Sequence, residues 1–185
     1  MLKLNEIFYS IQGEGYNTGL PAVFVRLAGC NLACSWCDTD HSLRMEMTED
    51  QIVEEAMRYP TRRAILTGGE PTIQDIGPLI DALHYRFFWI AIESNGVLQI
   101  PPGIDWITVS PKSPGQWVCN ELKVVYTGKE DLSAYDAVKR APGGCAYKFL
   151  QPCDGMDNVQ ETVQKVLETR GWRLSLQTHK LIGIR

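Results

Sequence analysis

The stretch PAVFVRLAGCNLACSWC, residues 21–37, joins an apolar run to a cluster of three thiols. Its first part is rich in aliphatic and aromatic residues, which is typical of a strand with both faces buried. The run is followed at once by Cys30, Cys34 and Cys37, which fall within eight residues. The segment therefore predicts a buried strand whose following loop presents three sulfur ligands.

Further apolar runs recur outward from this segment and alternate with helical patterns. Thr48 and Gln51 have the spacing of a capping box at the start of the first helix. Alternating strands and helices predict an α/β fold with mostly parallel strands. The predicted strands cover residues 21–28, 62–66, 87–93, 105–110, 121–126, 145–150 and 172–177, and the predicted helices cover 49–59, 73–85, 131–140 and 159–170.

Two connections between predicted strands, residues 94–104 and 111–120, are short and contain Pro and Gly. A parallel crossover usually needs a dozen residues or more, and most often a helix. We therefore expect a curved sheet with an incomplete outer layer of helices. The length of 185 residues indicates one domain over residues 1–185.

Composition excludes several classes of protein. Hydrophobic residues make up 44% and charged residues 22%, so the chain can form an ordinary core. The net charge of -4 argues against nucleic acid as a partner, because phosphate binding needs clustered cations. Residues 1–6 lack the apolar run of a secretory signal, and residues 87–92 are too short to cross a membrane. We expect a soluble, cytoplasmic protein without a membrane partner.

The spacing C-x3-C-x2-C leaves three interpretations open. Three local thiolates suit an iron–sulfur cluster that keeps one iron open for a ligand. Zinc is the second interpretation, with His41 or a distant cysteine as fourth ligand. Buried thiols or disulfides are the third, although a reducing compartment disfavours disulfides.

A second motif, Thr67-Gly68-Gly69-Glu70-Pro71, follows the next predicted strand. Paired glycines allow a backbone to approach a ligand closely and permit positive φ. The carboxylate of Glu70 is suited to an ammonium group. Taken alone, the glycine pair is more typical of an ordinary strand-to-loop turn.

The two motifs together resemble the radical S-adenosylmethionine superfamily, with Trp36 directly before Cys37 as in its cysteine signature. Further segments resemble the 7-carboxy-7-deazaguanine synthase family across nearly the whole chain. They are residues 6–15 (EIFYSIQGEG), 37–39 (CDT), 93–96 (ESNG), 110–112 (SPK), 120–123 (NELK), 151–155 (QPCDG) and 177–180 (QTHK).

This resemblance implies a shortened, partial (β/α) barrel that works as a homodimer. The implied reaction is a radical ring contraction of 6-carboxy-5,6,7,8-tetrahydropterin to 7-carboxy-7-deazaguanine, with loss of ammonia, in queuosine and deazapurine biosynthesis. The implied cofactors are a [4Fe–4S] cluster, S-adenosylmethionine and Mg²⁺, and the implied electron donor is a reducing partner such as flavodoxin or ferredoxin.

The resemblance also assigns roles to individual residues. Cluster ligation falls to Cys30, Cys34 and Cys37, and Mg²⁺ ligation to Thr39. Substrate binding falls to Ile11, Gln12, Gly13, Arg26, Thr67 and Arg185. S-adenosylmethionine binding falls to Trp36, Asp38, Gly69, Ser110, Pro111, Lys112, Gln151, Pro152, Cys153 and Asp154. Glu14 and His179 are further candidates for substrate contact.

Arg26 lies in an otherwise apolar strand, where a charge is costly unless it is paired. Its guanidinium suits a substrate carboxylate, or alternatively an ion pair with Glu14 or Glu70. Cys119 and Cys145 are expected to be buried thiols. Two rival functions stay open, a radical activase acting on a partner protein and a non-enzymatic iron–sulfur or zinc module.

Overall fold

The computed structural model describes residues 1–141 and 146–185. Within these residues, nine strands form one sheet in the order β11-β10-β8-β6-β5-β4-β2-β1-β3. The strands are β1 (Leu2–Ile11), β2 (Pro21–Leu27), β3 (Met45–Met47), β4 (Arg63–Gly68), β5 (Trp89–Ser94), β6 (Trp106–Val109), β8 (Glu121–Tyr126), β10 (Tyr147–Pro152) and β11 (Trp172–Leu174).

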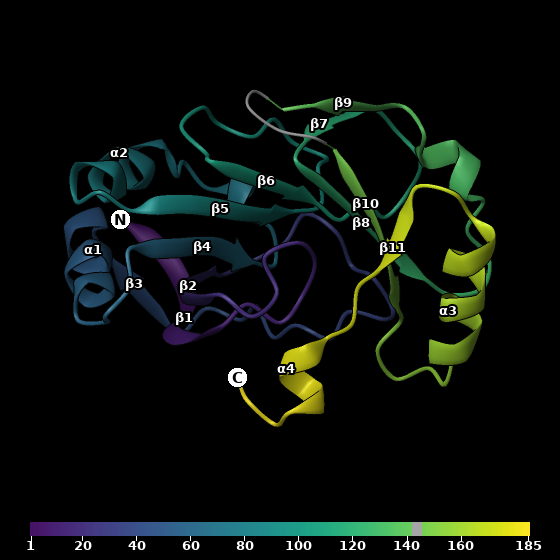
Figure 1. Cartoon of the computed structure of the whole chain (residues 1–185). Coiled ribbons are helices and arrows are strands. Elements are labelled where there is room, and N and C mark those ends of the chain that lie inside the picture. Colours follow the sequence, from purple (N-terminus) through teal and green to yellow (C-terminus); the bar gives the residue numbers. More distant parts are fainter. Residues whose placement is uncertain (142–145) are drawn as a thin grey trace.

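The central part of the sheet is parallel, as the sequence predicts. Strands β2, β4, β5, β6, β8, β10 and β11 are paired in parallel, one beside the next. Strand β1 was not predicted, and it adds antiparallel to β2 and β3. No ladder between described residues joins the two edge strands, so the curved sheet is a partial barrel rather than a closed one (Figure 1).

Helices cover the two ends of the sheet and leave its middle with little cover (Figure 1). Helices α1 (Glu49–Met57) and α2 (Gly77–Tyr85) pack beside each other near β4 and β5, while α3 (Val159–Glu168) packs on β10 and β11. The connection between β5 and β6 contains no helix. The expected incomplete helix layer is therefore confirmed.

The strands are continuously apolar because alternate side chains point to opposite faces of the sheet and both faces are buried. In β2, Val23 and Val25 face the core under α1 and α2, whereas Phe24 belongs to a separate apolar cluster on the other face. Both faces of this strand are thus buried, as in sheets covered on both sides. Arg26 shares the inner face with Phe24, because side chains two apart point the same way.

The predicted helix over residues 131–140 is wrong. This segment forms a short 3-10 helix, η2 (Leu132–Tyr135), followed by β9 (Val138–Arg140). Leu132 and Tyr135 are buried together in the second core, and this spacing needs only one helical turn. Strand β9 then pairs with β7 (Trp117–Cys119) in a separate two-stranded sheet.

Other predicted bounds also change. A 3-10 turn, η1 (Pro71–Ile73), precedes α2, so the predicted helix 73–85 begins later, at Gly77. The last strand ends at Leu174 instead of 177, and Thr178–Leu181 form helix α4. Ser175 just after the strand still donates its amide to Leu150 O, and its hydroxyl donates to the Gln151 side chain and accepts from the Gly15 amide. Cys145 lies outside the described residues.

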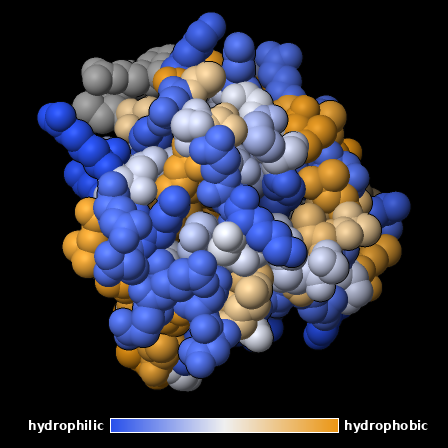
Figure 2. Space-filling view, turned by 90° about the vertical axis from the view of Figure 1, so that its right-hand side faces the viewer, coloured by the Kyte–Doolittle hydropathy of each residue, from blue (hydrophilic) through white to orange (hydrophobic). Residues whose placement is uncertain are grey.

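The outer face at the α3 end of the molecule is mainly hydrophilic, with separate apolar patches at its margins (Figure 2). Cys119 is fully buried in the second core, as expected. No helix among the described residues is long and apolar enough to span a membrane.

Candidate active site

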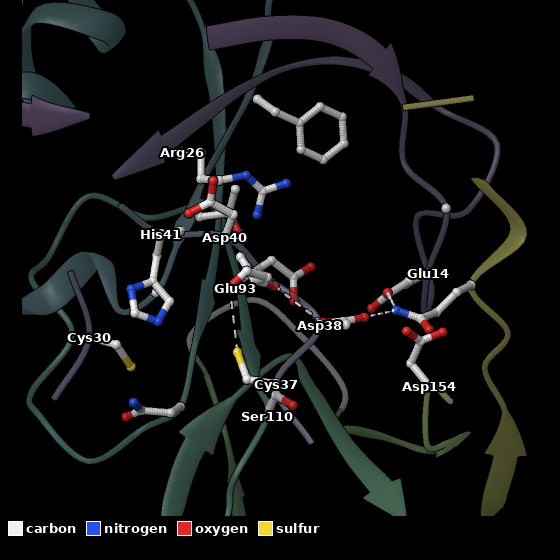
Figure 3. A pocket seen from close by; sticks show the side chains of 18 of the residues that line it. Glu14, Arg26, Cys30, Cys37, Asp38, Asp40, His41, Glu93, Ser110 and Asp154 are labelled. Atoms are coloured by element: carbon white, nitrogen blue, oxygen red, sulfur yellow. Dashed lines mark hydrogen bonds between the residues drawn. The ribbon is translucent and has the colours of Figure 1, made fainter. Parts of the chain in front are cut away.

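A cavity of about 670 Å³ opens where the parallel strands end. This is the edge at which α/β sheets bind ligands, since the loops after successive strands meet there. The cavity is lined by loops and by the inner faces of β1, β2, β4, β5, β8 and β10. Figure 3 shows Arg26, Glu14 and Glu93 among the side chains that line it.

Most residues that the sequence singled out line this one cavity. They are Ile11, Gln12, Gly13, Arg26, Cys30, Cys34, Trp36, Cys37, Asp38, Thr39, Thr67, Gly69, Ser110, Lys112, Gln151, Pro152, Asp154 and Arg185. Two do not line it. Pro111 is buried beside the cavity wall, and Cys153 is 2% exposed and turned into the protein.

The loop after β2 carries the three cysteines in irregular backbone on the cavity rim. Cys30 and Cys34 are partly exposed, Cys37 is exposed, and none forms a disulfide. Of the other cysteines in residues 1–141 and 146–185, Cys119 and Cys153 are buried and do not line the cavity. Three accessible thiols on one loop fit a cluster that needs three protein thiolates and one open iron.

The three thiols do not yet converge on one point. Among residues 1–141 and 146–185, no group of three His, Cys, Asp or Glu side chains is close enough to hold a metal ion. Cys30 Sγ accepts a hydrogen bond from the Leu32 amide, and Cys37 Sγ donates to the Thr39 carbonyl. A [4Fe–4S] cluster binds each thiolate through a different iron, so its ligands need not converge on one point. Cluster binding would replace these two thiol hydrogen bonds with iron–sulfur bonds.

The Gly68–Gly69 pair packs against the start of the cysteine loop. A Cβ atom on Gly69 would lie 2.1 Å from the Gly29 carbonyl oxygen and 2.8 Å from Cys30 Cβ. The Gly69 amide donates to Leu27 O, and the Glu70 amide donates to Gly29 O. Glycine at position 69 is thus required because the loop after β4 packs closely on the backbone of the loop after β2.

Glu70 does not face a ligand, contrary to the expectation that its carboxylate meets an ammonium group. The side chain is fully buried and accepts hydrogen bonds from the Thr72 amide and hydroxyl, the Ser94 hydroxyl and the Asn95 amide. These donors hold η1 and the end of β5 together. Its role is therefore to position the loops after β4 and β5.

Lys112 lies over the residue that precedes the last cysteine of the motif. Its Nζ is 4.9 Å from the centre of the Trp36 ring and 3.0 Å from Ser110 Oγ. Burial lowers the pKa of Lys112, and the nearby thiols of Cys34 and Cys37 act in the opposite direction. Lys112, which follows β6, therefore places a cation next to the cysteine loop, which follows β2.

Asp38 is held by the C-terminal segment. Its Oδ2 accepts from Gln177 Nε2 at 2.8 Å and from Lys180 Nζ at 2.6 Å, and Lys180 also pairs with Asp154 at 3.0 Å. Burial acts to raise the pKa of Asp38, but these hydrogen bonds and the Lys180 charge lower it to about 2. Two residues expected at the cofactor are therefore joined by a lysine that sequence reasoning left without a role.

Arg26 and Arg185, both expected at the substrate, share one carboxylate. Glu6 Oε1 accepts from Arg26 Nε at 2.8 Å, and Glu6 Oε2 pairs with the Arg185 guanidinium. Both guanidinium groups lie over the ring of Phe8. Arg26 is thus paired with Glu6, not with Glu14 or Glu70 as the alternative interpretation expected.

This cluster carries two cations and one carboxylate. The net positive charge leaves donor groups for a bound anion such as a carboxylate. Glu6 lies directly opposite Arg26 in the β1–β2 ladder. The pairing of Glu6 with Arg26 could not be predicted without strand β1, which the sequence pattern did not indicate.

A buried ion-pair network lines another part of the cavity wall. Lys123 Nζ is 2.5 Å from Glu14 Oε2 and 3.0 Å from Glu93 Oε2, and only 6% of its side chain is exposed. Gln12 donates to Glu93 Oε1 at 3.0 Å, so the amide expected at the substrate also orients a carboxyl group. Lys123 could have been identified from the sequence in the same way as Arg26, because it is also a charged residue within an apolar strand.

The C-terminal segment closes the side of the cavity formed by the β1–β2 loop. The Thr178 amide and hydroxyl both donate to the Gly13 carbonyl. His179 packs against Gly13 so closely that a Cβ there would lie 2.1 Å from His179 Nδ1. Residues 13 and 179 therefore approach closely across the fold, and His179 lines the cavity beside Glu14.

Comparison with known proteins agrees with this geometry. A family model described as the Radical SAM superfamily matches residues 24–141. The chain therefore belongs to this superfamily, whose members hold an iron–sulfur cluster and S-adenosylmethionine. This membership implies a [4Fe–4S] cluster, which supports the cluster interpretation over zinc and over buried thiols or disulfides. The assignment of Cys30, Cys34 and Cys37 as its ligands stays a prediction.

Full-length relatives define the branch of this superfamily. A 7-carboxy-7-deazaguanine synthase of Bacteroides thetaiotaomicron is 50% identical, with complete coverage of both chains. One of Neisseria meningitidis is 38% identical over 98% of this chain and 93% of that protein. The crystal structure of QueE from Escherichia coli matches with a TM-score of 0.77 and 30% identity, covering 96% of this chain and 94% of that one. The chain belongs to the 7-carboxy-7-deazaguanine synthase family.

Proposed function

We propose that this protein converts 6-carboxy-5,6,7,8-tetrahydropterin to 7-carboxy-7-deazaguanine with release of ammonia. The supporting observation is that one cavity combines the three-cysteine loop with the Arg26–Glu6–Arg185 cluster. The first feature serves radical initiation, and the second serves an anionic substrate. A small-molecule cavity of this size also fits a bicyclic substrate beside a nucleoside cofactor.

The cluster and S-adenosylmethionine, when bound, supply a 5′-deoxyadenosyl radical that abstracts hydrogen from the substrate. The residues of the chain bind and orient the cofactor and the substrate, and they shield the reaction from solvent. Cys30, Cys34 and Cys37 hold the cluster. The S-adenosylmethionine site is assigned to Trp36, Asp38, Gly69, Ser110, Lys112, Gln151, Pro152 and Asp154, which all line the cavity.

Substrate binding is assigned to the wall formed by β1, β2 and β4. Arg26 and Arg185 bind the substrate carboxylate, since a guanidinium matches a carboxylate with two parallel hydrogen bonds. Thr67 lies next to Arg26 in the β2–β4 ladder and contacts the ring. The backbone of residues 11–13 pairs with the donors and acceptors of the pterin edge.

Mg²⁺ is assigned to Thr39, with the remaining ligands from water and from substrate oxygens. In support, the Thr39 hydroxyl lies on the cavity rim and donates to Asp38 Oδ1 at 3.2 Å, which leaves its own lone pairs available. Thr39→Ala and metal chelation should both depress product formation more than uncoupled cleavage of S-adenosylmethionine. Turnover that is indifferent to both would overturn the assignment.

Two partners complete the proposal. A low-potential protein such as flavodoxin or ferredoxin donates the electron, and a second copy of the chain forms a homodimer. In support of self-association, Tyr9, Ile11 and Ile184 expose apolar side chains around a shallow hollow outside the main cavity. Light scattering of the purified protein tests the dimer.

The deciding experiment is anaerobic reconstitution of the cluster followed by turnover with the carboxytetrahydropterin. We expect 5′-deoxyadenosine, 7-carboxy-7-deazaguanine and ammonia. Cofactor cleavage without any pterin-derived product would instead favour action on another substrate, such as a partner protein.

A further inference from the structure

Lys180 pairs with carboxylates from two different loops of the cavity. Asp38 follows the last cysteine of the loop after β2, and Asp154 lies in the loop after β10. Figure 3 shows these two carboxylates on the same side of the cavity as Glu14. We propose that Lys180 is a positioning residue for the S-adenosylmethionine site, because its ammonium group holds Asp38 and Asp154 together. The inference rests on the proposed assignment of both carboxylates to this cofactor and adds a residue to it.

Lys180 belongs to a C-terminal segment, residues 175–185, that crosses the open side of the partial barrel (Figure 1). The segment leaves the sheet at β11, which is one edge, and returns beside β1, next to the other edge. There Thr178 donates to the Gly13 carbonyl, and the Ser10 hydroxyl donates to the Arg185 carbonyl. No strand ladder in residues 1–141 and 146–185 joins the two edges. Contacts of the C-terminal segment therefore make the connection that strand pairing makes in a closed barrel.

The position of Asp154 depends on Lys180 more than that of Asp38 does. Asp38 Oδ2 also accepts from Gln177 Nε2 at 2.8 Å, and Asp38 Oδ1 accepts from the Thr39 hydroxyl at 3.2 Å. In the described part of the chain, by contrast, Lys180 is the one side chain that pairs with the Asp154 carboxylate, through Oδ2 at 3.0 Å. A carboxylate held through one oxygen can still accept a hydrogen bond from a ribose hydroxyl through the other.

The ammonium group also offsets the repulsion between the two carboxylates. Burial acts to lower the pKa of Lys180, but the hydrogen bonds and charges of Asp38 and Asp154 raise it, so the group is charged at neutral pH. Without this charge, two like charges would face each other and favour separation of the loops. The side chains of all three residues are partly exposed, and ion pairs of this kind add little to stability. Lys180 therefore affects the geometry of the site more than the stability of the fold.

Calorimetric titration of S-adenosylmethionine into the reconstituted, oxidised full-length enzyme tests the inference without turnover. We expect Lys180→Met to weaken binding by about 10-fold or more, because the charged hydrogen bonds that hold a binding group are lost. Iron content and the thermal unfolding temperature should stay near those of wild type. Lys180→Arg should restore most of the affinity, since a guanidinium has donors enough for both carboxylates.

Lys148→Met is the matched control. Lys148 Nζ pairs with Asp136 at 2.6 Å, as Lys180 does with Asp38, but Lys148 does not line the cavity. This variant should bind S-adenosylmethionine as wild type does. Equal weakening in Lys148→Met and Lys180→Met would show a general effect of losing a lysine ion pair and overturn the inference.

A double-mutant cycle tests whether Lys180 acts through Asp154. Asp154→Ala should weaken binding of S-adenosylmethionine, and Lys180→Met should then weaken it further by less than it does in the wild-type background. Effects that simply multiply would mean that Lys180 acts independently of Asp154, against the proposal. Wild-type affinity in Asp154→Ala would refute the assignment of Asp154 to the cofactor, on which the inference depends.

Steady-state kinetics separate the cofactor site from the substrate site. Lys180→Met should raise KM for S-adenosylmethionine and leave KM for the carboxytetrahydropterin nearly unchanged. Equal increases in both would show that Lys180 only anchors the C-terminal segment, which also carries His179 and Arg185, and would overturn its role as a positioning residue for the cofactor. A wild-type enzyme that forms no pterin-derived product would overturn the proposed function, whereas the calorimetric result for Lys180 would stand.

Discussion

The cysteine loop and the inner wall of the sheet meet at one cavity but are built in opposite ways. Residues 29–44 have no regular secondary structure, and their three free thiols are partly or fully exposed at the cavity. The inner wall carries Arg26 on β2 and Lys123 on β8, where ion pairs already fix both side chains.

This difference follows from what each region has to bind. A cluster forms strong metal–sulfur bonds, which can draw an irregular loop into shape. A pterin forms only hydrogen bonds and ion pairs, so its binding groups must be held in place beforehand. The loop is thus shaped by its ligand, whereas the wall is shaped by the sheet.

The largest expected effect comes from Cys34→Ala. Loss of one thiolate leaves the cluster with two protein ligands, so reconstituted iron content should fall and S-adenosylmethionine cleavage should become undetectable. The unfolding free energy of the cluster-free protein should change by less than about 0.5 kcal/mol, because the thiol contacts little.

Cys119→Ala is the matched control with the opposite pattern. It should cost about 1 kcal/mol in stability, since Cys119 is buried in the core, and leave iron content unchanged. Iron measurement and urea unfolding of both proteins check the contrast. Cluster retention in Cys34→Ala together with loss in Cys119→Ala would contradict the ligand assignment.

Arg26→Met tests the wall. Loss of a charged hydrogen-bond partner is worth about 1.5–3 kcal/mol, so the substrate requirement should rise roughly 10- to 150-fold. Iron content and affinity for S-adenosylmethionine should stay normal. Steady-state turnover against substrate concentration measures the effect, and an unchanged substrate requirement would remove Arg26 from the substrate site.

Gly69→Ala tests the junction between the two regions. Its Cβ would lie 2.1 Å from Gly29 O, so the cysteine loop must move away from β4, at a cost of about 1–3 kcal/mol in stability. The reconstituted cluster should also be lost faster in air. Gly77→Ala is the control, because the nearest atom to its Cβ is a side-chain oxygen of Asp75 at 3.3 Å. Similar effects of the two substitutions would show that Gly69 has no special relation to the loop.

A further effect concerns the pH dependence of stability near the wall. Burial raises the pKa of Glu121 from 4.5 to about 7, with the charge of Glu93 adding and that of Lys123 opposing. The folded state therefore holds this proton more tightly than the unfolded state, and the associated stability is lost as pH rises from about 4.5 to 7. Glu121→Gln removes this titration. Thermal unfolding should show that the stability of the variant rises relative to that of wild type as pH increases across this range. Stability profiles that stay parallel with pH would contradict the prediction.

The sequence predicted the chemistry of the cysteine loop because that chemistry is local. Cys30, Cys34 and Cys37 lie within eight residues, and their spacing favoured a cluster with three thiolate ligands while leaving zinc and buried thiols open. The parallel strands were also predictable, since an apolar run reports burial of both faces wherever the strand lies in the sheet. The bounds of the helices were less predictable, because the spacing of Leu132 and Tyr135 fits both the start of a long helix and a single helical turn.

The partners of the wall residues were decided by the tertiary structure alone. Glu14 and Lys123 lie 109 positions apart, and Glu6 meets both Arg26 and Arg185 only because β1 pairs with β2 and the chain's last residues return beside it. A charge within an apolar strand shows from sequence that a partner must exist, because an unpaired buried charge is too costly. Which partner it finds depends on strand order and on the face of the sheet, and these follow from how the whole chain packs.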